Sequence, residues 1–527
     1  MLSDVSRANQ RDKGIGHIQT AKTVESTVED EFETLRGREA QRYIVSKAVE
    51  VGERVRTTLG PLGYDKMMVD KMGEFQLTND GASILKMGGD RDPVARIVAQ
   101  AAKAQEALVF DGTTGTTITL AELLKLAMGL IEKGVQTNAV MKGYRHALEI
   151  AIRSAESNAN EGDTPYEAAK KVAQTAITGK SAEAYIDILS DICAKAAEAA
   201  TPDNIKLIGR PGDPKDSELI EGVVILKQNS YPTDEEVFEG RILLLDEELG
   251  PPQANLSLAD PAKIAQVAKV QQQYMEERLA AIDELNIKAV LCQKGMDSKA
   301  IQHFRRKGIL AVRNIRKSDM HRIAKATNGE VTADLADFML EELGTGTCTI
   351  RGKEGPNPYI QVVGENVQVA SIVLPAPTEQ TAAEFSRAMD DAIGVAYITA
   401  KNPMTVPGAG SIQARMAADI RNSEPMESSR AELAKLAFAD ALMIIPRTLA
   451  ETAAMDIIDT LYALSMNPEL GVDPITESVC DMTHVVEPLA LVISCLNTAT
   501  ENAISLLRTD EIQKSRPIQE TFADEMS

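Results

Sequence analysis

The chain has 527 residues, of which 44% are hydrophobic, so it is long enough to bury more than one large core. Its net charge of −22 repels the phosphates of nucleic acids and the surface of anionic membranes, and we expect neither as a partner. Aromatic residues make up only 4% of the chain and tryptophan is absent from it, a composition that favours long helices packed through alanine and leucine.

Cysteine usage and the distribution of apolar residues bear on the cellular compartment. The five cysteines are scattered without a Cys-x-x-Cys pair, and the five histidines are equally dispersed, which disfavours a disulfide framework or a zinc site. The first residues contain no apolar signal core, and we find no apolar run of membrane-spanning length. We therefore expect a cytoplasmic protein in a reducing compartment.

Helical periodicity dominates residues 31–156, where apolar side chains recur every three or four positions. Three loops dense in Gly, Thr and Asp interrupt it, at 57–63, 77–82 and 111–117. The backbone N–H groups of the first and third loops can approach an anion closely because the residues are small. The third loop runs directly into a helix, whose first N–H groups lack intrahelical partners and therefore favour a phosphate group.

Two of these loops carry a carboxylate beside a glycine, namely Asp80 and Asp111. Carboxylates near a phosphate site indicate Mg²⁺, which prefers oxygen ligands. Taken singly the loops are weak signals, because a Gly-Thr turn at a helix start is usually only a cap and Asn79-Asp80-Gly81 favours a hairpin turn. The spacing matches neither a Walker P-loop nor a Rossmann loop. Together, however, the three loops predict a nucleotide site.

The sequence pattern changes in the middle of the chain. Alanine-rich helices are expected from 158 to 200, and prolines and a glycine then break the pattern up to residue 214. Beyond about residue 220, strand-like runs are expected at 223–226, 242–245, 289–292, 309–312, 359–369 and 370–374, and helices at 262–285 and 298–307. From residue 381 the chain is again helical almost to its end. This order predicts an α/β domain inserted into a discontinuous helical body.

The tip of a protrusion is predicted within the inserted domain, at 249–258. A helix follows, with Asp260 as its N-cap and Pro261 as its first residue. Ile264, Val267 and Ala268 share one face of that helix, which either packs on its own domain or contacts another protein.

Several of these segments carry a resemblance to the chaperonins of the archaeal and eukaryotic-cytosolic type (group II, which includes the thermosome). The resemblance spans about residues 36–508. Its markers are Thr57-Thr58-Leu59-Gly60-Pro61, Thr78-Asn79-Asp80-Gly81-Ala82, Asp111-Gly112-Thr113-Thr114, Thr178-Gly179-Lys180, Cys292-Gln293-Lys294-Gly295-Met296-Asp297, Ala311-Val312-Arg313, Lys317-Ser318-Asp319-Met320, Ala324-Lys325-Ala326-Thr327 and Ile445-Pro446-Arg447-Thr448-Leu449-Ala450-Glu451. Their order and spacing match the family, which makes the resemblance specific.

The chain also departs from the family's pattern. Phe110 stands where Gly is usual, Gly115 where a third Thr is usual, and Leu62 where Lys is usual. Gln413 stands where Glu is common, and the segment 408–410 replaces a triple Gly. These departures indicate a divergent branch, and the archaeal-like chaperonins of bacteria (group III) are the branch that we favour.

The resemblance implies a multidomain α+β architecture, the chaperonin fold. It comprises a mainly α-helical equatorial domain, a small hinge-like intermediate domain and an α/β apical domain with a helical protrusion. The implied boundaries are 1–152 and 406–527 for the equatorial domain, 153–220 and 356–405 for the intermediate domain, and 221–355 for the apical domain with its lid protrusion near 246–275.

The resemblance also implies an ATPase that uses ATP and Mg²⁺. Asp111 would be the metal ligand and Asp391 the general base, with Asp390 beside it as a solvated helix residue. Asp80 would orient the attacking water, and Lys180 would sense the γ-phosphate unless it is only an exposed lysine at a helix end. The remaining nucleotide contacts would come from Thr58, Leu59, Gly60, Pro61, Gly112, Thr113, Thr114, Gly115, Thr116, Gly408 and Gly410.

The implied function is an ATP-driven folding chaperone that closes a built-in lid over its client. Its partners would be unfolded client proteins and further copies of the chain, in a double ring of about sixteen subunits. Two alternatives are considered. A small-molecule kinase would need an acceptor pocket, for which the sequence offers no residues. An ATP-binding ring scaffold with little or no folding activity is disfavoured by the retention of Asp80, Asp111 and Asp391.

Overall fold

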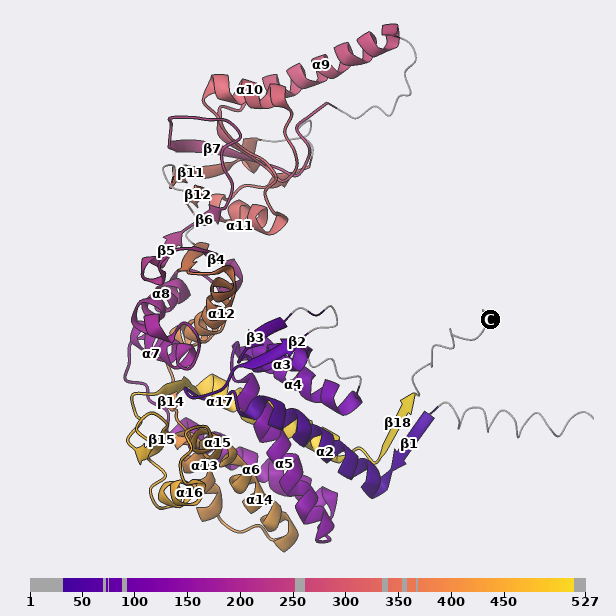
Figure 1. Cartoon of the computed structure of the whole chain (residues 1–527), viewed down its shortest axis with the longest axis vertical. Coiled ribbons are helices and arrows are strands. Elements are labelled where there is room, and N and C mark those ends of the chain that lie inside the picture. The colour runs from indigo at the N-terminus through magenta and orange to yellow at the C-terminus, as the bar shows by residue number, and fades with distance from the viewer. Residues whose placement is uncertain are drawn as a thin grey trace, which may run out of the picture.

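The computed structural model describes residues 32–515, apart from 70–72, 74, 88–91, 252–260, 334–339, 353–357 and 366–367. Within helices and strands, the side chains of 32–33, 76, 261–268 and 514–515 are also outside the description. The described chain forms three regions stacked along its long axis, which we call the base, the middle region and the upper region (Figure 1). Residues 252–258 of the tip predicted at 249–258, and the predicted apolar face of Ile264, Val267 and Ala268, therefore lie outside the described residues.

The base is mainly helical and is built from both ends of the chain (Figure 1). Its helices are α2 (Gly37–Arg56), α3 (Gly81–Met87), α4 (Pro93–Val109), α5 (Thr113–Glu132), α6 (Thr137–Ser157), α13 (Ser411–Asn422), α14 (Ser429–Leu442), α15 (Ile444–Thr452), α16 (Ile457–Met466) and α17 (Leu489–Leu507). Its strands pair two by two: β1 (Phe32–Arg36) with β18 (Glu511–Ser515), β2 (Lys66–Val69) with β3 (Phe75–Thr78), β14 (Thr405–Pro407) with β17 (Val486–Pro488), and β15 (Gly471–Asp473) with β16 (Ser478–Cys480).

Helix α5 is the centre of the base, since α2, α4, α14 and α17 all pack against it. The approach of α2 is close, because a Cβ atom at Gly52 would lie 2.7 Å from the Cβ atom of Ala121. By length and composition alone α5 and α17 are apolar enough to cross a membrane, a test that a buried core helix also passes. The reason is their place in the core, where a helix contacted on most sides is apolar on most sides. Their most apolar windows are 61% and 44% buried.

The middle region packs helices on a small sheet. Strand β13 (Ala370–Ala376) lies between β4 (Ile205–Pro211), to which it is parallel, and β5 (Glu218–Glu221), to which it is antiparallel. The helices are α7 (Pro165–Ile177), α8 (Ile186–Ala199) and α12 (Glu379–Lys401), with short 3-10 turns at Glu183–Tyr185, Pro202–Asn204 and Pro214–Asp216. Every residue of β13 is buried, and α12 crosses next to it, so the middle region shares one continuous apolar core with the base.

The upper region is a mixed sheet in the strand order β6-β12-β11-β7-β8-β9, with β10 paired to β7. The strands are β6 (Val223–Ile225), β7 (Val237–Leu245), β8 (Ile287–Cys292), β9 (Leu310–Val312), β10 (Val331–Thr332), β11 (Gly344–Arg351) and β12 (Tyr359–Gly364). The helices are α9 (Pro261–Glu284), α10 (Ser298–Lys307) and α11 (Lys317–Thr327), with a 3-10 turn at Leu340–Glu342. Helix α9 starts at the predicted Pro261, whereas Asp260 lies outside the described residues.

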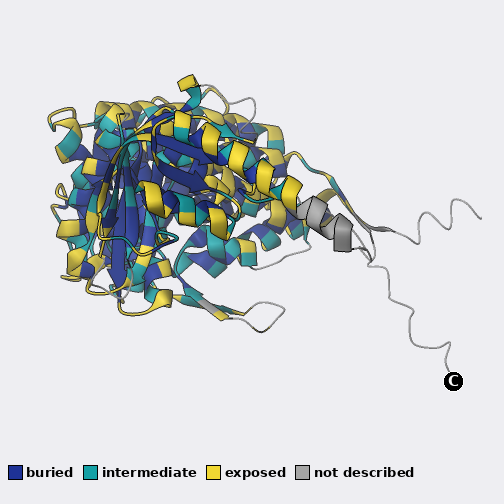
Figure 2. Cartoon of the chain, turned by 90° about the horizontal axis from the view of Figure 1, so that it is seen from above, coloured by how far each residue is buried: buried dark blue, intermediate teal, exposed yellow. Residues whose placement is uncertain are grey.

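Both faces of the upper sheet are covered. Ile242 and Leu244 of β7 join the core on the side of α11, whereas Leu243 and Leu245 join the core on the side of α9 and α10. A strand buried on both faces is apolar at consecutive positions, which is why the runs at 242–245 and 289–292 were readable from the sequence. Figure 2 shows these buried strands beneath helices with exposed outer surfaces.

The two strand-like segments expected at 359–369 and 370–374 are separate strands that join different sheets. The first contains β12, which pairs with β11 in the upper sheet, and the second belongs to β13 in the middle sheet. The expected boundary at residue 356 therefore falls one strand too early, because hydrogen-bond pairing and not the local pattern decides which sheet a strand joins.

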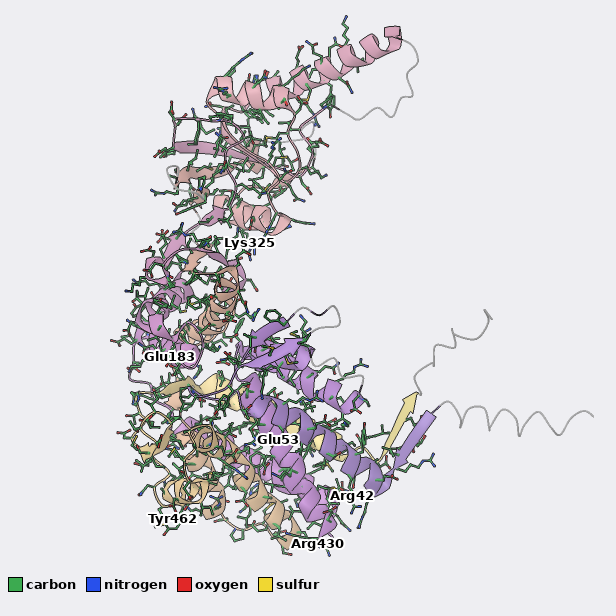
Figure 3. The ribbon with its side chains drawn as sticks, in the orientation of Figure 1. Arg42, Glu53, Glu183, Lys325, Arg430 and Tyr462 are labelled. Atoms are coloured by element: carbon green, nitrogen blue, oxygen red, sulfur yellow. The ribbon has the colours of Figure 1, made fainter. Side chains whose placement is uncertain are left out.

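The joint between the upper and middle regions contains a buried ion pair. The ammonium of Lys206 on β4 lies 2.8 Å from a carboxylate oxygen of Asp319 on α11, with the side chains 15% and 8% exposed. Lys325, labelled at the same joint in Figure 3, donates to the side-chain oxygen of Asn204 at 3.0 Å. These contacts hold α11 over the edge of the middle sheet.

Candidate nucleotide site

A cavity of about 650 Å³ lies where the base meets the middle region. It brings together side chains and loops that are up to 438 positions apart in the sequence, from Thr58 to Leu496. The predicted site residues that line it are Thr58, Leu59, Gly60, Pro61, Asp80, Asp111, Gly112, Thr113, Thr114, Gly115, Lys180, Asp391 and Gly410.

The loop after α2 forms one wall of the cavity. Helix α2 ends at Arg56, and Thr58 turns its hydroxyl back to donate to the carbonyl of Val55 at 2.8 Å. Gly60 has a φ of +86°, a conformation that a side chain would strain. The chain then folds over itself, with the N–H of Tyr64 donating to the carbonyl of Thr57 at 2.8 Å. A compact backbone loop results, with its small residues facing the cavity.

The opposite wall is the start of α5. Its N-cap residue Gly112 has a φ of +82° and provides no side-chain cap for the first turn. The first N–H groups of this 20-residue helix are therefore left for another acceptor. They point from the positive end of the helix dipole, a favourable environment for phosphate. Gly81 fits tightly here, since a Cβ atom on it would lie 2.6 Å from the hydroxyl oxygen of Thr114.

The two loop carboxylates are oriented by backbone groups. Asp80 accepts from the N–H of Ala82 at 3.1 Å and from that of Ser83 at 3.0 Å, so it caps the start of α3. The Asn79-Asp80-Gly81 segment is therefore a helix start, and the hairpin interpretation is wrong. One oxygen of Asp111 accepts from the N–H of Gly112 at 2.6 Å, which fixes the carboxylate beside the start of α5.

Lys180 and Asp391 form an ion pair inside the cavity. The ammonium lies 2.5 Å from a carboxylate oxygen, and the two side chains are only 20% and 23% exposed. Burial raises the pKa of Asp391 to about 7; the Lys180 ammonium opposes that shift, and the negative charge of Asp111 adds to it. Burial alone would lower the pKa of Lys180, but the nearby carboxylates, Asp391 first, raise it on balance. Lys180 is thus a charged partner of Asp391, not an exposed lysine at a helix end, whereas Asp390 is exposed.

The middle region touches the base directly at this cavity. Gly179, with a φ of +80°, lies so close to the first loop that a Cβ atom on it would be 2.8 Å from the carbonyl oxygen of Gly60. Asn79 donates to the carbonyl of Gly179 at 3.1 Å, and Glu183 accepts from its N–H at 3.2 Å. Glu183 is labelled at this junction in Figure 3. The segment that leads into Lys180 therefore rests on the base.

The donor set at the cavity fits Mg²⁺ bound together with a nucleotide. The described residues hold no cluster of three or more His, Cys, Asp or Glu side chains that could enclose a metal alone. Asp111 has one oxygen committed to Gly112, which leaves the second for a metal. Mg²⁺ is commonly held by one or two carboxylates together with phosphate oxygens and water, so a single carboxylate beside a phosphate cradle suits it.

For three of the predicted nucleotide-contact residues, the structure shows surroundings that the sequence did not reveal. Thr116 is fully buried and does not line the cavity, because it belongs to the inward face of α5. Gly408 also does not line it; a Cβ atom there would contact Val485 at 3.0 Å. Gly410 lines the cavity, but its closest approach is to Pro446, at 2.7 Å from a Cβ atom. The small size of these glycines serves protein packing.

Glu487 is a cavity residue that the sequence analysis missed. It lies on β17, opposite Val406 of β14, and lines the cavity. Burial raises its pKa to about 7, and the negative charge of Asp111 adds to the shift. The available signal was a single acid between Val486 and Pro488 in an otherwise apolar stretch, which by itself predicts nothing.

Comparisons with known proteins identify one family and several relatives to which the chain is similar. The sequence model of the TCP-1/cpn60 chaperonin family matches residues 51–517. A thermosome subunit beta of Archaeoglobus fulgidus is 35% identical over 512 residues, which cover 92% of this chain and 93% of the relative. A thermosome subunit of Methanopyrus kandleri is 36% identical, with 92% and 93% covered. A thermosome subunit alpha of Thermoplasma acidophilum is 34% identical, with 91% and 92% covered.

Proposed function

The chain belongs to the TCP-1/cpn60 chaperonin family, and from this premise we propose that it hydrolyses ATP at the cavity between the base and the middle region. Its function is ATP-dependent protein folding as a chaperonin, and the thermosome subunits are its relatives. The single observation that supports the site is the cavity itself, where two anion-binding walls, Asp111 and the Lys180–Asp391 pair come together.

The proposed chemistry needs one base and a rigid phosphate cradle. The loop at 57–63 and the first N–H groups of α5 hold the phosphates, and Asp111 holds Mg²⁺, which would neutralise charge on the phosphate oxygens. Asp391 takes a proton from water as the water oxygen bonds to the γ-phosphorus and the bond to the ADP oxygen breaks. Lys180 holds that carboxylate in place and compensates its charge. Asp80, fixed by the backbone of α3, orients the water.

The proposed site is assembled from the middle region and the base, so motion of one region relative to the other gates hydrolysis. Lys180 and Asp391 belong to the middle region, whereas Asp80 and Asp111 belong to the base. Hydrolysis therefore requires the middle region to rest on the base, and hinge motion controls the rate.

The proposed domain layout follows the family. The base corresponds to the equatorial domain, the middle region to the intermediate domain and the upper region to the apical domain with a lid protrusion. Members of the family assemble into double rings around unfolded clients; we propose about sixteen subunits for this chain and a cytoplasmic location.

The test of the site is the substitution Asp391→Ala in the assembled protein. We expect phosphate release to fall by roughly 10²–10⁴-fold, the usual loss for a positioned base, while nucleotide binding persists. Asp390→Ala, in the adjacent exposed carboxylate, is the matched control and should keep the wild-type rate. A wild-type rate in Asp391→Ala would refute the assignment.

A second measurement separates the chaperonin from the two alternatives. Phosphate release without any small-molecule acceptor, stimulated by an unfolded protein, supports the folding ATPase. Release that depends on an acceptor would indicate a kinase. Nucleotide binding without release would indicate a scaffold.

A further inference from the structure

One contact between the base and the middle region depends on the bulky side chain of Phe110. Phe110 directly precedes Asp111, at a position where the resemblance described above implies Gly. Its backbone ends α4 in the left-handed conformation, with a φ of +65°, and its N–H donates to the carbonyl of Glu106 at 2.9 Å. A bulky residue is uncommon in that conformation and persists only where its surroundings hold it.

The surroundings that hold Phe110 are a notch in α12. Gly394 is buried there, and a Cβ atom on it would lie 2.2 Å from both the Cβ and the Cγ atoms of Phe110. No real pair of side-chain atoms comes that close, so the ring of Phe110 rests on the bare backbone of α12. Gly394 has a φ within the ordinary helical range, so the glycine is needed here for space and not for backbone freedom.

The notch lies next to the proposed base. Gly394 follows Asp391 by three positions on α12, and residues three apart in a helix lie on the same side. Phe110 is covalently joined to Asp111, whose carboxylate is fixed to Gly112 at 2.6 Å. The ring therefore connects the turn that carries Asp391 to the loop that carries Asp111.

We propose that Phe110 is a positioning residue for ATP hydrolysis, which acts by seating its ring in the Gly394 notch and setting the approach of Asp391 to Asp111. This inference rests on the proposed function of the cavity. In this role Phe110 contacts no reacting atom. It sets the distance between the carboxylate of Asp391 in the middle region and that of Asp111 in the base. Positioning of this kind influences the rate steeply, because a misplacement of 1 Å can cost roughly 10²-fold in turnover.

The experiment is a double-mutant cycle in the full-length, assembled protein. Gly394→Ala places a methyl group in the ring's position and should lower the turnover of ATP by roughly 10- to 100-fold. The dissociation constant of Mg-ADP should change by less than about threefold, because the phosphate cradle lies in the base. Adding Phe110→Gly removes the clash, so the double variant should recover to the rate of Phe110→Gly alone, roughly threefold to tenfold below the wild type.

Two controls make the result specific. Gly129→Ala is also a substitution of a helical glycine, on α5, where a Cβ atom would meet nothing within 4 Å, and it should leave turnover and binding unchanged. Asp391→Ala tests the proposed function separately. If Asp391→Ala is active, the site assignment fails; if it is inactive but the cycle shows no rescue, only the role of Phe110 fails.

If Gly394→Ala does not fold, Phe110→Gly is measured alone. This substitution introduces no clash and only empties the notch in α12. We expect its turnover to fall by roughly threefold to tenfold with Mg-ADP affinity retained, and amide exchange in α12 near Asp391 to become faster. Wild-type turnover together with wild-type exchange in Phe110→Gly would overturn the proposal.

Discussion

The pH dependence of turnover follows from the buried pair in the cavity. A general base works only when it is deprotonated, and burial raises the pKa of Asp391 to about 7. The deprotonated fraction is then about one-eleventh at pH 6 and about ten-elevenths at pH 8, so kcat/KM for Mg-ATP should rise roughly tenfold over this interval. Activity is thus gained as the pH rises.

Lys180 sets the pH at which Asp391 is half deprotonated, which is the midpoint of the pH profile. Its ammonium lies 2.5 Å from the Asp391 carboxylate and opposes the effect of burial, whereas Asp111 and Asp80 add negative charge that raises the pKa further. Lys180→Met removes the opposing charge, so the midpoint should move upward and the rate at pH 7 should fall. At high pH much of the loss should be recovered, because the base is then deprotonated again. Lys180→Arg should keep the midpoint near that of the wild type.

The assay is steady-state phosphate release between pH 5.5 and 9 at constant ionic strength, with kcat/KM taken at each pH from the dependence of the rate on Mg-ATP concentration. Asp390→Asn is the matched control, since this carboxylate is adjacent in sequence but exposed, and its profile should equal that of the wild type. A kcat/KM that does not vary with pH, or a midpoint that stays in place in Lys180→Met, would refute the coupling between the two side chains.

Three other predictions test separate parts of the molecule. Asp111→Ala should weaken Mg-ATP binding by roughly tenfold or more in calorimetric titration, with a smaller effect on metal-free ADP; unchanged Mg-ATP affinity would contradict a metal-binding role. Lys206→Met should destabilise the joint between the upper and middle regions by about 3–5 kcal/mol, because Asp319 is then left buried without its 2.8 Å partner. Amide exchange in α11 measures this loss, and Lys206→Met/Asp319→Leu should recover most of it; full stability of the single variant would show that the pair is dispensable. Deletion of residues 250–260 should leave rings and ATPase intact but abolish protection of a bound client from protease, and retained protection would argue against a built-in lid.

The sequence by itself determined the secondary-structure classes and the position of the Gly- and Thr-rich loops that line the cavity. The buried runs at 242–245 in β7 and 289–292 in β8 could be recognised in the sequence, because a strand segment covered on both faces is apolar at consecutive positions. The loops before α3 and α5 could be recognised because Gly, Thr and Asp are enriched where the backbone turns tightly and begins a helix. Family motifs added the expectation that Asp391 and Lys180 belong to the same site.

Only the tertiary structure decided which distant groups meet and what each glycine is for. The neighbouring strands β12 and β13 join different sheets because long-range hydrogen-bond pairing, which the local pattern does not encode, decides the partners of each strand. Glu487 belongs to the cavity because β17 pairs with β14, a contact between segments about eighty residues apart. Likewise, the seating of Phe110 on Gly394 depends on how α12 crosses the end of α4, and no local signal in either segment encodes that crossing. Local propensities act over a few residues, whereas these contacts are set by the packing of whole helices and sheets.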